Sequence, residues 1–125
     1  VADNPHKKPL FLVAERAKML KEATKDFAGV EVKSFDCLAV DFARKNHAKV
    51  IIRGLRMISD FEYEFQMALT NRKLDDSIET IFMMPSEEYS YVSSKLIKEA
   101  SALGANLRDF VPSHVEKELI KRIGR

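Results

Sequence analysis

The sequence holds one cysteine, no tryptophan, and only four glycines and four prolines in 125 residues. Cys37 has no partner for an internal disulfide bond, so a packed core must supply stability, as is usual in the reducing cytoplasm. The low glycine and proline content excludes collagen-like and low-complexity chains. No apolar run approaches the roughly 20 residues needed to span a bilayer, and the amino end lacks a signal-peptide pattern. We expect one cytoplasmic globular domain, residues 1–125, without membrane contact.

The chain also has little net charge. Its 21 Lys and Arg against 19 Asp and Glu leave a formal charge of +2, which is too small to indicate a general nucleic-acid binder. A bound anion must therefore be met by a local cluster of cations. The three histidines, at positions 6, 47 and 114, and the lone cysteine lack metal-ligand spacing, so we expect no built-in metal site.

Helical and strand patterns alternate along the chain. Apolar residues three or four positions apart predict helices, and alternating or continuous β-branched runs predict strands. The predicted helices are Pro9 to Phe27 (stopped by Gly29), Leu38 to Asn46, Ser59 to Leu74, Ser94 to Leu103 and Ser113 to Ile123; the predicted strands are Val30 to Phe35, Lys49 to Ile52 and Ile78 to Met84.

This alternation favours the doubly wound α/β class, in which a parallel sheet is covered on both faces. Each strand is then expected to be buried on both sides. Three strands leave open edges and unpaired backbone groups. We therefore expect amino-terminal sequence to be missing; the alternative is a complete three-stranded domain covered by its helices or by a partner subunit.

The clearest candidate site follows the second predicted strand. Ligands in α/β sheets collect beyond the carboxyl ends of the strands, where this chain places Arg53, Gly54 and Arg56. A guanidinium can bind two phosphate oxygens at once, and glycine permits close backbone approach. A lone arginine there would more often be merely solvated, but two around a glycine predict a phosphate site.

Three other polar elements have plainer interpretations. Lys7 and Lys8 before the first helix are typical of a solvated surface. Ser93 or Ser94 is a plausible helix N-cap, with ordinary capping and anion binding about equally favoured. Helical spacing puts Arg56, Asp60 and Glu64 on one face, where ion pairing is the ordinary role.

Several motifs together resemble bacterial phosphopantetheine adenylyltransferase of the nucleotidylyltransferase superfamily. The likeness runs in one order through essentially the whole chain. It rests on Lys7-Lys8-Pro9, Phe42-Ala43-Arg44, Ile52-Arg53-Gly54-Leu55-Arg56, Asp60-Phe61-Glu62-Tyr63-Glu64, Phe82-Met83-Met84-Pro85-Ser86, Val92-Ser93-Ser94 and Leu96-Ile97-Lys98-Glu99.

The resemblance implies a Rossmann-like fold and transfer of an adenylyl group from ATP, carried with Mg²⁺, to 4′-phosphopantetheine. It also implies a homohexamer. Lys7 and Arg53 would be the catalytic residues that contact substrate phosphates. The pantetheine arm would be lined by Leu38, Ala39 (through its backbone), Met67, Asn71 and Glu99; ATP would be bound by Gly54, Leu55, Arg56, Glu64, Tyr89, Ser90, Tyr91, Val92, Ser93, Ser94 and Lys95.

The sequence departs from the family in two places. The signature T-x-G-H, whose Thr and His contact nucleotide phosphates, has no counterpart, and the sheet's first strand and helix are expected to be missing with it. Lys95 replaces the usual Ser or Thr. The alternatives are another nucleotidylyltransferase with a different acceptor, such as nicotinate mononucleotide or phosphocholine, and a non-catalytic oligomerisation or anion-binding fragment.

We predict that these 125 residues alone are inactive or severely impaired, because the T-x-G-H groups that stabilise the transition state are absent. Formation of dephospho-coenzyme A by the isolated chain is the measurement. Turnover at a rate normal for this enzyme class would refute the prediction.

Overall fold

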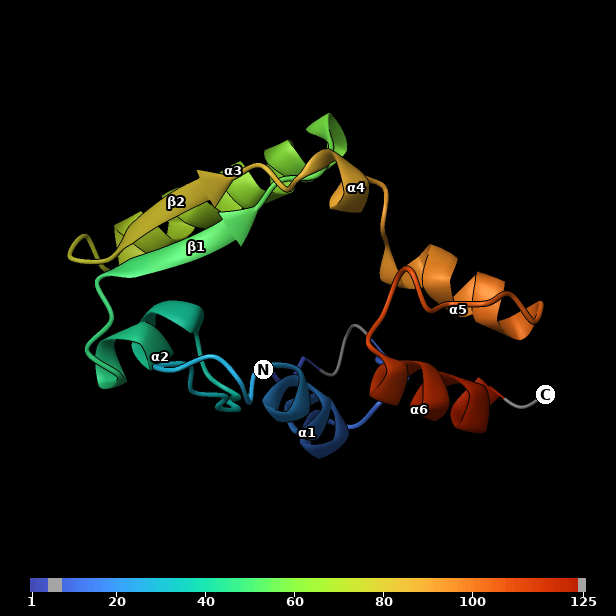
Figure 1. Cartoon of the computed structure of the whole chain (residues 1–125). Coiled ribbons are helices and arrows are strands. Elements are labelled where there is room, and N and C mark those ends of the chain that lie inside the picture. Colours follow the sequence, from blue (N-terminus) through green and yellow to red (C-terminus); the bar gives the residue numbers. More distant parts are fainter. Residues whose placement is uncertain (5–7, 124–125) are drawn as a thin grey trace. The chain divides into compact units, whose positions relative to one another are not determined.

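In a computed structural model, the described residues are 1–4 and 8–123 (Figure 1). The elements are α1 (Val13–Ala23), α2 (Ala39–Lys45), β1 (Val50–Gly54), α3 (Ile58–Leu74), β2 (Glu79–Met83), α4 (Glu87–Ser90), α5 (Ser94–Ala102) and α6 (Ser113–Ile123). The chain divides into a strand unit, Cys37–Tyr91, and a helical unit, Val1–Asp36 with Val92–Arg125. Each unit is described by itself.

The strand unit confirms the mixed α/β class with a parallel sheet. β1 and β2 pair in parallel, with Val50 opposite Glu79 and Gly54 opposite Met83. The Leu55 N–H donates to the Met83 carbonyl oxygen at 2.9 Å, just beyond the strand ends. α3 connects the two strands and lies along the sheet (Figure 1). This β–α–β order brings the carboxyl ends of both strands to one edge.

The core of the strand unit sits between α2 and the sheet. Val40 and Ile78 are 1% and 2% exposed, and Ala43 is also buried with them. Ala48 and Ile51 pack against this cluster. Because α2 carries Val40 and Ala43 three residues apart, both point from one helical face toward the strands.

The prediction that each strand is buried on both faces is wrong for the described residues. Exposed and half-buried residues alternate along both strands, which is the pattern of a sheet covered on one face. Ile51 and Arg53 lie on the half-buried side, whereas Ile52 and Met83 are largely exposed.

The predicted strand from Val30 to Phe35 is also wrong. Among the described residues, its strand pairing is an isolated parallel bridge between Ala2 and Phe35, beside which the Val1 ammonium donates to the Lys33 carbonyl oxygen at 2.6 Å. The Phe35 N–H donates to the Val1 carbonyl oxygen at 3.1 Å. Because Val30 is 51% exposed and the pairing reaches only one end of the segment, its alternating pattern produces no ladder.

The first helix is shorter than predicted at both ends. It begins at Val13 because the Glu15 carboxylate accepts the Leu12 N–H at 2.7 Å, which fixes the first turn there. It ends at Ala23, where the Thr24 hydroxyl donates to the Leu20 carbonyl oxygen at 2.8 Å. Gly29, with φ of 80°, lies beyond this end.

The predicted later helices are confirmed within two residues at each end, and α4 is an additional short helix. α5 ends in a Schellman motif, in which the Gly104 N–H donates to the Ser101 carbonyl oxygen and the Ala105 N–H donates to the Ala100 carbonyl oxygen. α2 ends in the same Schellman arrangement, but there His47 holds the left-handed position with φ of 56°.

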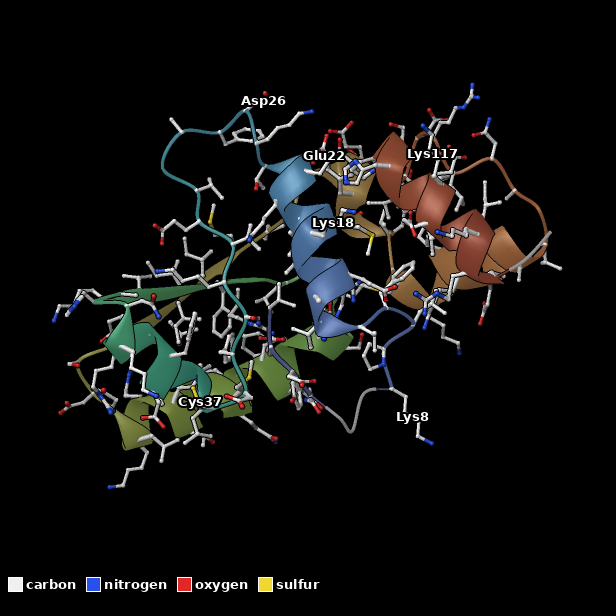
Figure 2. All side chains as sticks on the ribbon, turned by 90° about the horizontal axis from the view of Figure 1, so that it is seen from below. Lys8, Lys18, Glu22, Asp26, Cys37 and Lys117 are labelled. Atoms are coloured by element: carbon white, nitrogen blue, oxygen red, sulfur yellow. The ribbon has the colours of Figure 1, made fainter. Side chains whose placement is uncertain are left out.

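In the helical unit, α6 packs against both α5 and α1. The Arg122 guanidinium pairs with Glu15 and stands over the Phe11 ring. His114 Nε2 is 3.0 Å from the Met19 carbonyl oxygen. Lys117 on α6 and Glu22 on α1 mark the two helices in Figure 2. None of the described helices is long and apolar enough to cross a membrane.

Replacing Ile78 with alanine should lower the free energy of unfolding by about 2–4 kcal/mol, because the change leaves a cavity in a closed core. Urea unfolding of the purified chain measures it. Ile58→Ala is the matched control: Ile58 is 90% exposed, so its loss should cost under about 0.5 kcal/mol. Equal costs at the two sites would contradict the assigned core.

Candidate active site

Arg53 and Glu64 form a two-point ion pair where β1 ends. Arg53 Nε donates to Glu64 Oε2 and Nη2 donates to Oε1, both at 2.6 Å. The Glu64 side chain is 12% exposed and the Arg53 side chain 40%. The hydrogen bond that Arg53 donates to Glu64 raises the pKa of Arg53 above its ordinary value, so the guanidinium stays charged. One strand residue is thereby fixed to the second turn of α3.

Arg56 and Asp60 form a second pair one helical turn away. Arg56 Nε donates to Asp60 Oδ2 at 3.2 Å, and the two residues have the i,i+4 spacing of facing side chains. Asp60 lies in the first turn of α3, where a negative charge also interacts favourably with the helix dipole. The ion pairing expected for Arg56 and Asp60 is thus confirmed, although Arg56 itself precedes the helix.

The two pairs make one cluster, which we call the arginine cluster: Arg53, Arg56, Asp60 and Glu64. Its formal charge is zero, since two guanidiniums face two carboxylates. Asp60 and Glu64 are four residues apart and project from one face of α3. The structure therefore brings both predicted arginines to the sheet edge where α/β proteins bind ligands. Lys7, the third predicted cation, lies outside the described residues.

Gly54 leaves open space at this edge. A Cβ atom built on Gly54 would meet no atom within 4 Å, and its φ is not in the left-handed region. The fold itself therefore does not require glycine at this position. The open space leaves room for a ligand to approach the backbone closely.

The residues predicted to line a pantetheine arm sit on α3 and α2. Met67 and Asn71 are half-buried and continue the face of α3 that carries Glu64. Leu38 is the N-cap of α2 and Ala39 its first residue. Leu38 offers no capping oxygen, and the first amides of a helix have no acceptor inside it. This arrangement is consistent with the expected backbone role of Ala39 and leaves that role a prediction.

The predicted ATP-binding segment 89–95 falls across the boundary of the two units. Tyr89 and Ser90 belong to α4, and Tyr91 is its C-cap. Ser93 is the N-cap of α5, and its Oγ accepts the Leu96 N–H at 3.2 Å, so the capping interpretation is confirmed. Val92, Ser93, Ser94, Lys95 and Glu99 lie in the helical unit, and their approach to the arginine cluster stays a prediction.

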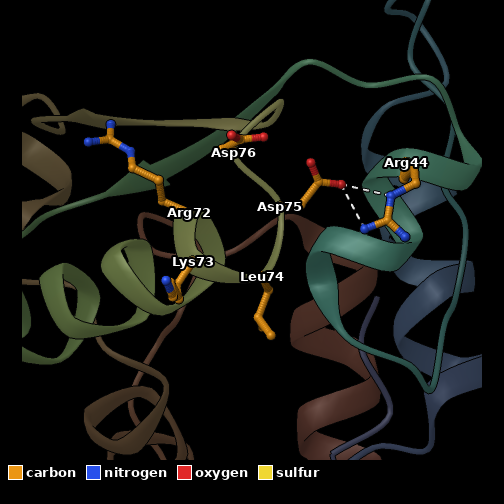
Figure 3. Close-up of a pocket in the computed structure, with 6 residues that line it drawn as sticks. All are labelled: Arg44, Arg72, Lys73, Leu74, Asp75 and Asp76. Atoms are coloured by element: carbon orange, nitrogen blue, oxygen red, sulfur yellow. Dashed lines mark hydrogen bonds and ion pairs between the residues drawn. The ribbon is translucent and has the colours of Figure 1, made fainter.

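Sequence reasoning missed a charged hollow at the opposite end of the strands (Figure 3). It has a volume of about 590 Å³ and is lined by Arg44, Arg72, Lys73, Leu74, Asp75 and Asp76. Hydrogen bonds from Ser77 and Arg44 lower the pKa of Asp75 to about 2. Arg44 Nε donates to Asp75 at 2.7 Å, which ties the end of α2 to the turn before β2. The separate runs Arg44-Lys45 and Arg72-Lys73 were the only sequence signal.

The described residues contain no group of three or more His, Cys, Asp or Glu side chains placed to hold a metal ion. The two carboxylates nearest the predicted phosphate site, Asp60 and Glu64, are bound to arginines. Cys37 is free and exposed (Figure 2). These side chains therefore do not fit a built-in magnesium site.

The low pKa of Asp75 predicts an acid-dependent loss of stability. Because its folded pKa lies below the ordinary value of 3.8, its ionised form stabilises the fold above that value. This contribution should disappear as the pH falls from about 5 toward 2. Thermal unfolding of wild type and Asp75→Asn across this range is the measurement, and the variant should show a flatter pH profile. Parallel profiles would contradict the assignment.

Comparison with known proteins places the chain among nucleotidyltransferases. The cytidylyltransferase-like family profile matches residues 1–100. A phosphopantetheine adenylyltransferase of Caldanaerobacter subterraneus is 55% identical over 95% of this chain and 74% of its own length. That of Moorella thermoacetica is 49% identical over 99% of this chain and 78% of its own length. That of Desulfosudis oleivorans is 51% identical over 97% of this chain and 72% of its own length. The chain therefore belongs to the cytidylyltransferase-like family and, within it, to the phosphopantetheine adenylyltransferases.

Proposed function

We propose that this protein transfers AMP from ATP to 4′-phosphopantetheine, producing dephospho-coenzyme A and pyrophosphate. Relatives named phosphopantetheine adenylyltransferase, at about half identity over nearly the whole chain, support the choice of acceptor. The arginine cluster at the carboxyl end of β1 is the structural observation that carries the proposal. It presents two guanidiniums in fixed directions where two phosphorylated substrates must meet.

The chemistry needs positioning more than covalent help. An oxygen of the 4′-phosphate attacks the α-phosphorus of ATP in line, and pyrophosphate leaves from the opposite side. Negative charge spreads over the phosphate oxygens as this happens, so fixed guanidiniums stabilise the transition state. Arg53 already binds a carboxylate through two parallel hydrogen bonds, and a phosphate presents the same spacing of acceptors. The Nη1 group of Arg53 takes no part in the pair with Glu64, so it can donate to a phosphate oxygen while Glu64 holds the guanidinium.

Specific roles follow for the remaining residues. Lys7 and Arg53 contact substrate phosphates; Gly54, Leu55, Arg56 and Glu64 contribute to the ATP site. Residues 89–95 enclose the nucleotide. The pantetheine arm runs along Leu38, Ala39, Met67, Asn71 and Glu99.

Three further proposals concern the metal ion, the assembly and a sequence element. Mg²⁺ would arrive bound to the ATP phosphates, a usual arrangement for this ion. The active form would be a homohexamer in the cytoplasm. We also propose that turnover needs a Thr-x-Gly-His element, which does not occur within these 125 residues.

Two other functions can be separated from this one by the acceptor. A related nucleotidylyltransferase would release pyrophosphate with nicotinate mononucleotide or phosphocholine in place of phosphopantetheine. A non-catalytic anion-binding module would bind both substrates and release no pyrophosphate. Pyrophosphate release with each acceptor, measured on the chain supplied with a Thr-x-Gly-His element, distinguishes the three. Release with 4′-phosphopantetheine alone is expected.

In the chain supplied with a Thr-x-Gly-His element, replacing Arg53 with alanine should weaken 4′-phosphopantetheine binding and lower kcat/KM by at least about tenfold, since a charged hydrogen bond to substrate is lost. Arg53→Lys should give affinity and kcat/KM between those of wild type and Arg53→Ala, because an ammonium keeps the charge but cannot make the two parallel hydrogen bonds of a guanidinium. Isothermal titration and initial rates measure both.

Arg72→Ala is the matched control, because Arg72 also forms an ion pair, with Glu79 at 2.8 Å, and lies at the other end of the sheet. Binding should be unchanged in this control. If Arg53→Ala left both binding and turnover intact, Arg53 would have no place in the proposed site.

A further inference from the structure

Asp60 has no role in the proposed function, yet it holds one of the site's two arginines. Its Oδ2 accepts from Arg56 Nε at 3.2 Å, and its Oδ1 is 3.5 Å from Arg56 Nη2. The carboxylate therefore faces one side of the guanidinium at two points. The Asp60 side chain is more buried than that of Arg56, with 28% against 41% exposure.

Arg56 needs external support because its backbone lies in a connection. β1 ends at Gly54 and α3 begins at Ile58, so Arg56 belongs to neither element. An unrestrained arginine side chain has conformational entropy that binding would otherwise have to remove. Asp60, by contrast, is part of the first turn of a 17-residue helix, where its N–H donates to the Met57 carbonyl oxygen at 3.0 Å.

We propose that Asp60 is a positioning residue that presets the Arg56 guanidinium beside Arg53 for binding the ATP phosphates. This inference rests on the proposed function. Glu64 holds Arg53 in the same way one turn further along α3. The helix thus sets the spacing of both guanidiniums through two carboxylates on one face, and the substrate meets a fixed pair rather than two mobile side chains.

Positioning and simple electrostatics predict opposite signs for loss of the Asp60 charge. A carboxylate beside the site repels the triphosphate, so removing it should tighten ATP binding if charge alone matters. If Asp60 acts by holding Arg56, removing it should weaken binding, because the guanidinium must then be ordered at the moment of binding. The sign of the change is therefore diagnostic.

The experiment uses isothermal titration to measure the affinity for ATP of the chain supplied with a Thr-x-Gly-His element, for Asp60→Asn and for Glu62→Gln. Both variants remove one negative charge from the start of α3. Glu62 is exposed and two residues further on, so it projects about 200° around the helix from Asp60. We expect Asp60→Asn to raise the Kd for ATP about 5- to 10-fold, and Glu62→Gln to leave it unchanged or slightly lower.

A double-mutant cycle tests whether Asp60 acts through Arg56. In an Arg56→Ala background, Asp60→Asn should change the Kd by less than about twofold, because the group that it positions is gone. Asp60→Glu, which keeps a carboxylate on the helix, should recover part of the affinity. Circular dichroism melting of each variant identifies any general loss of folding, which would weaken binding in both backgrounds alike.

The outcomes separate the two proposals. The positioning role would be overturned if Asp60→Asn bound ATP as tightly as Glu62→Gln does. It would also be overturned if Asp60→Asn raised the Kd for ATP by the same factor with and without Arg56. Either result would leave the proposed function standing. If the wild-type chain supplied with a Thr-x-Gly-His element bound neither ATP nor 4′-phosphopantetheine, the proposed function would be overturned and the inference would fall with it.

Discussion

The site depends on two ion pairs between the end of one strand and the start of one helix. Arg53 lies near the end of β1 and Arg56 follows it, and their partners Glu64 and Asp60 lie on successive turns of α3. These pairs are partly exposed, and surface pairs of this kind add little to stability. Their consequence is geometric, because they give two flexible side chains defined directions. A cluster with zero formal charge can also be held close together without ligand, and each guanidinium keeps N–H groups beyond those that its carboxylate engages.

The rest of the strand unit supports this arrangement. Val40, Ala43 and Ile78 bury the side of α2 against the sheet. The Arg44 and Asp75 pair lies at the opposite end of the strand unit, beside the charged hollow. Proteins of this fold class bind their ligands at the carboxyl ends of the strands and not at that end. A rigid β–α–β frame with its chemistry at one edge suits adenylyl transfer, in which the protein holds two polyanions in line and contributes no covalent intermediate.

Much of this could be predicted from local patterns. The run Val50-Ile51-Ile52 and the 3.6-residue spacing of α3 predict a strand and a helix, and the strand exit singles out Arg53 and Arg56. Val30 to Phe35 could not be predicted correctly, because alternation says nothing of whether a neighbouring strand continues. The end of α2 places His47 where glycine is usual, so its turn carries no sequence signal. The Arg53 and Glu64 pair joins residues eleven positions apart, and only the return of α3 along β1 brings them together.

The central claim is that both arginines bind substrate phosphate from the positions in which α3 holds them. Its most direct test is nuclear magnetic resonance of the arginine Nε–H groups during titration with ATP and 4′-phosphopantetheine. The account predicts that the signals of Arg53 and Arg56 shift together, while that of Arg72 does not move. Saturating substrate that left both signals in place, or shifted Arg72 as much as Arg53, would contradict it.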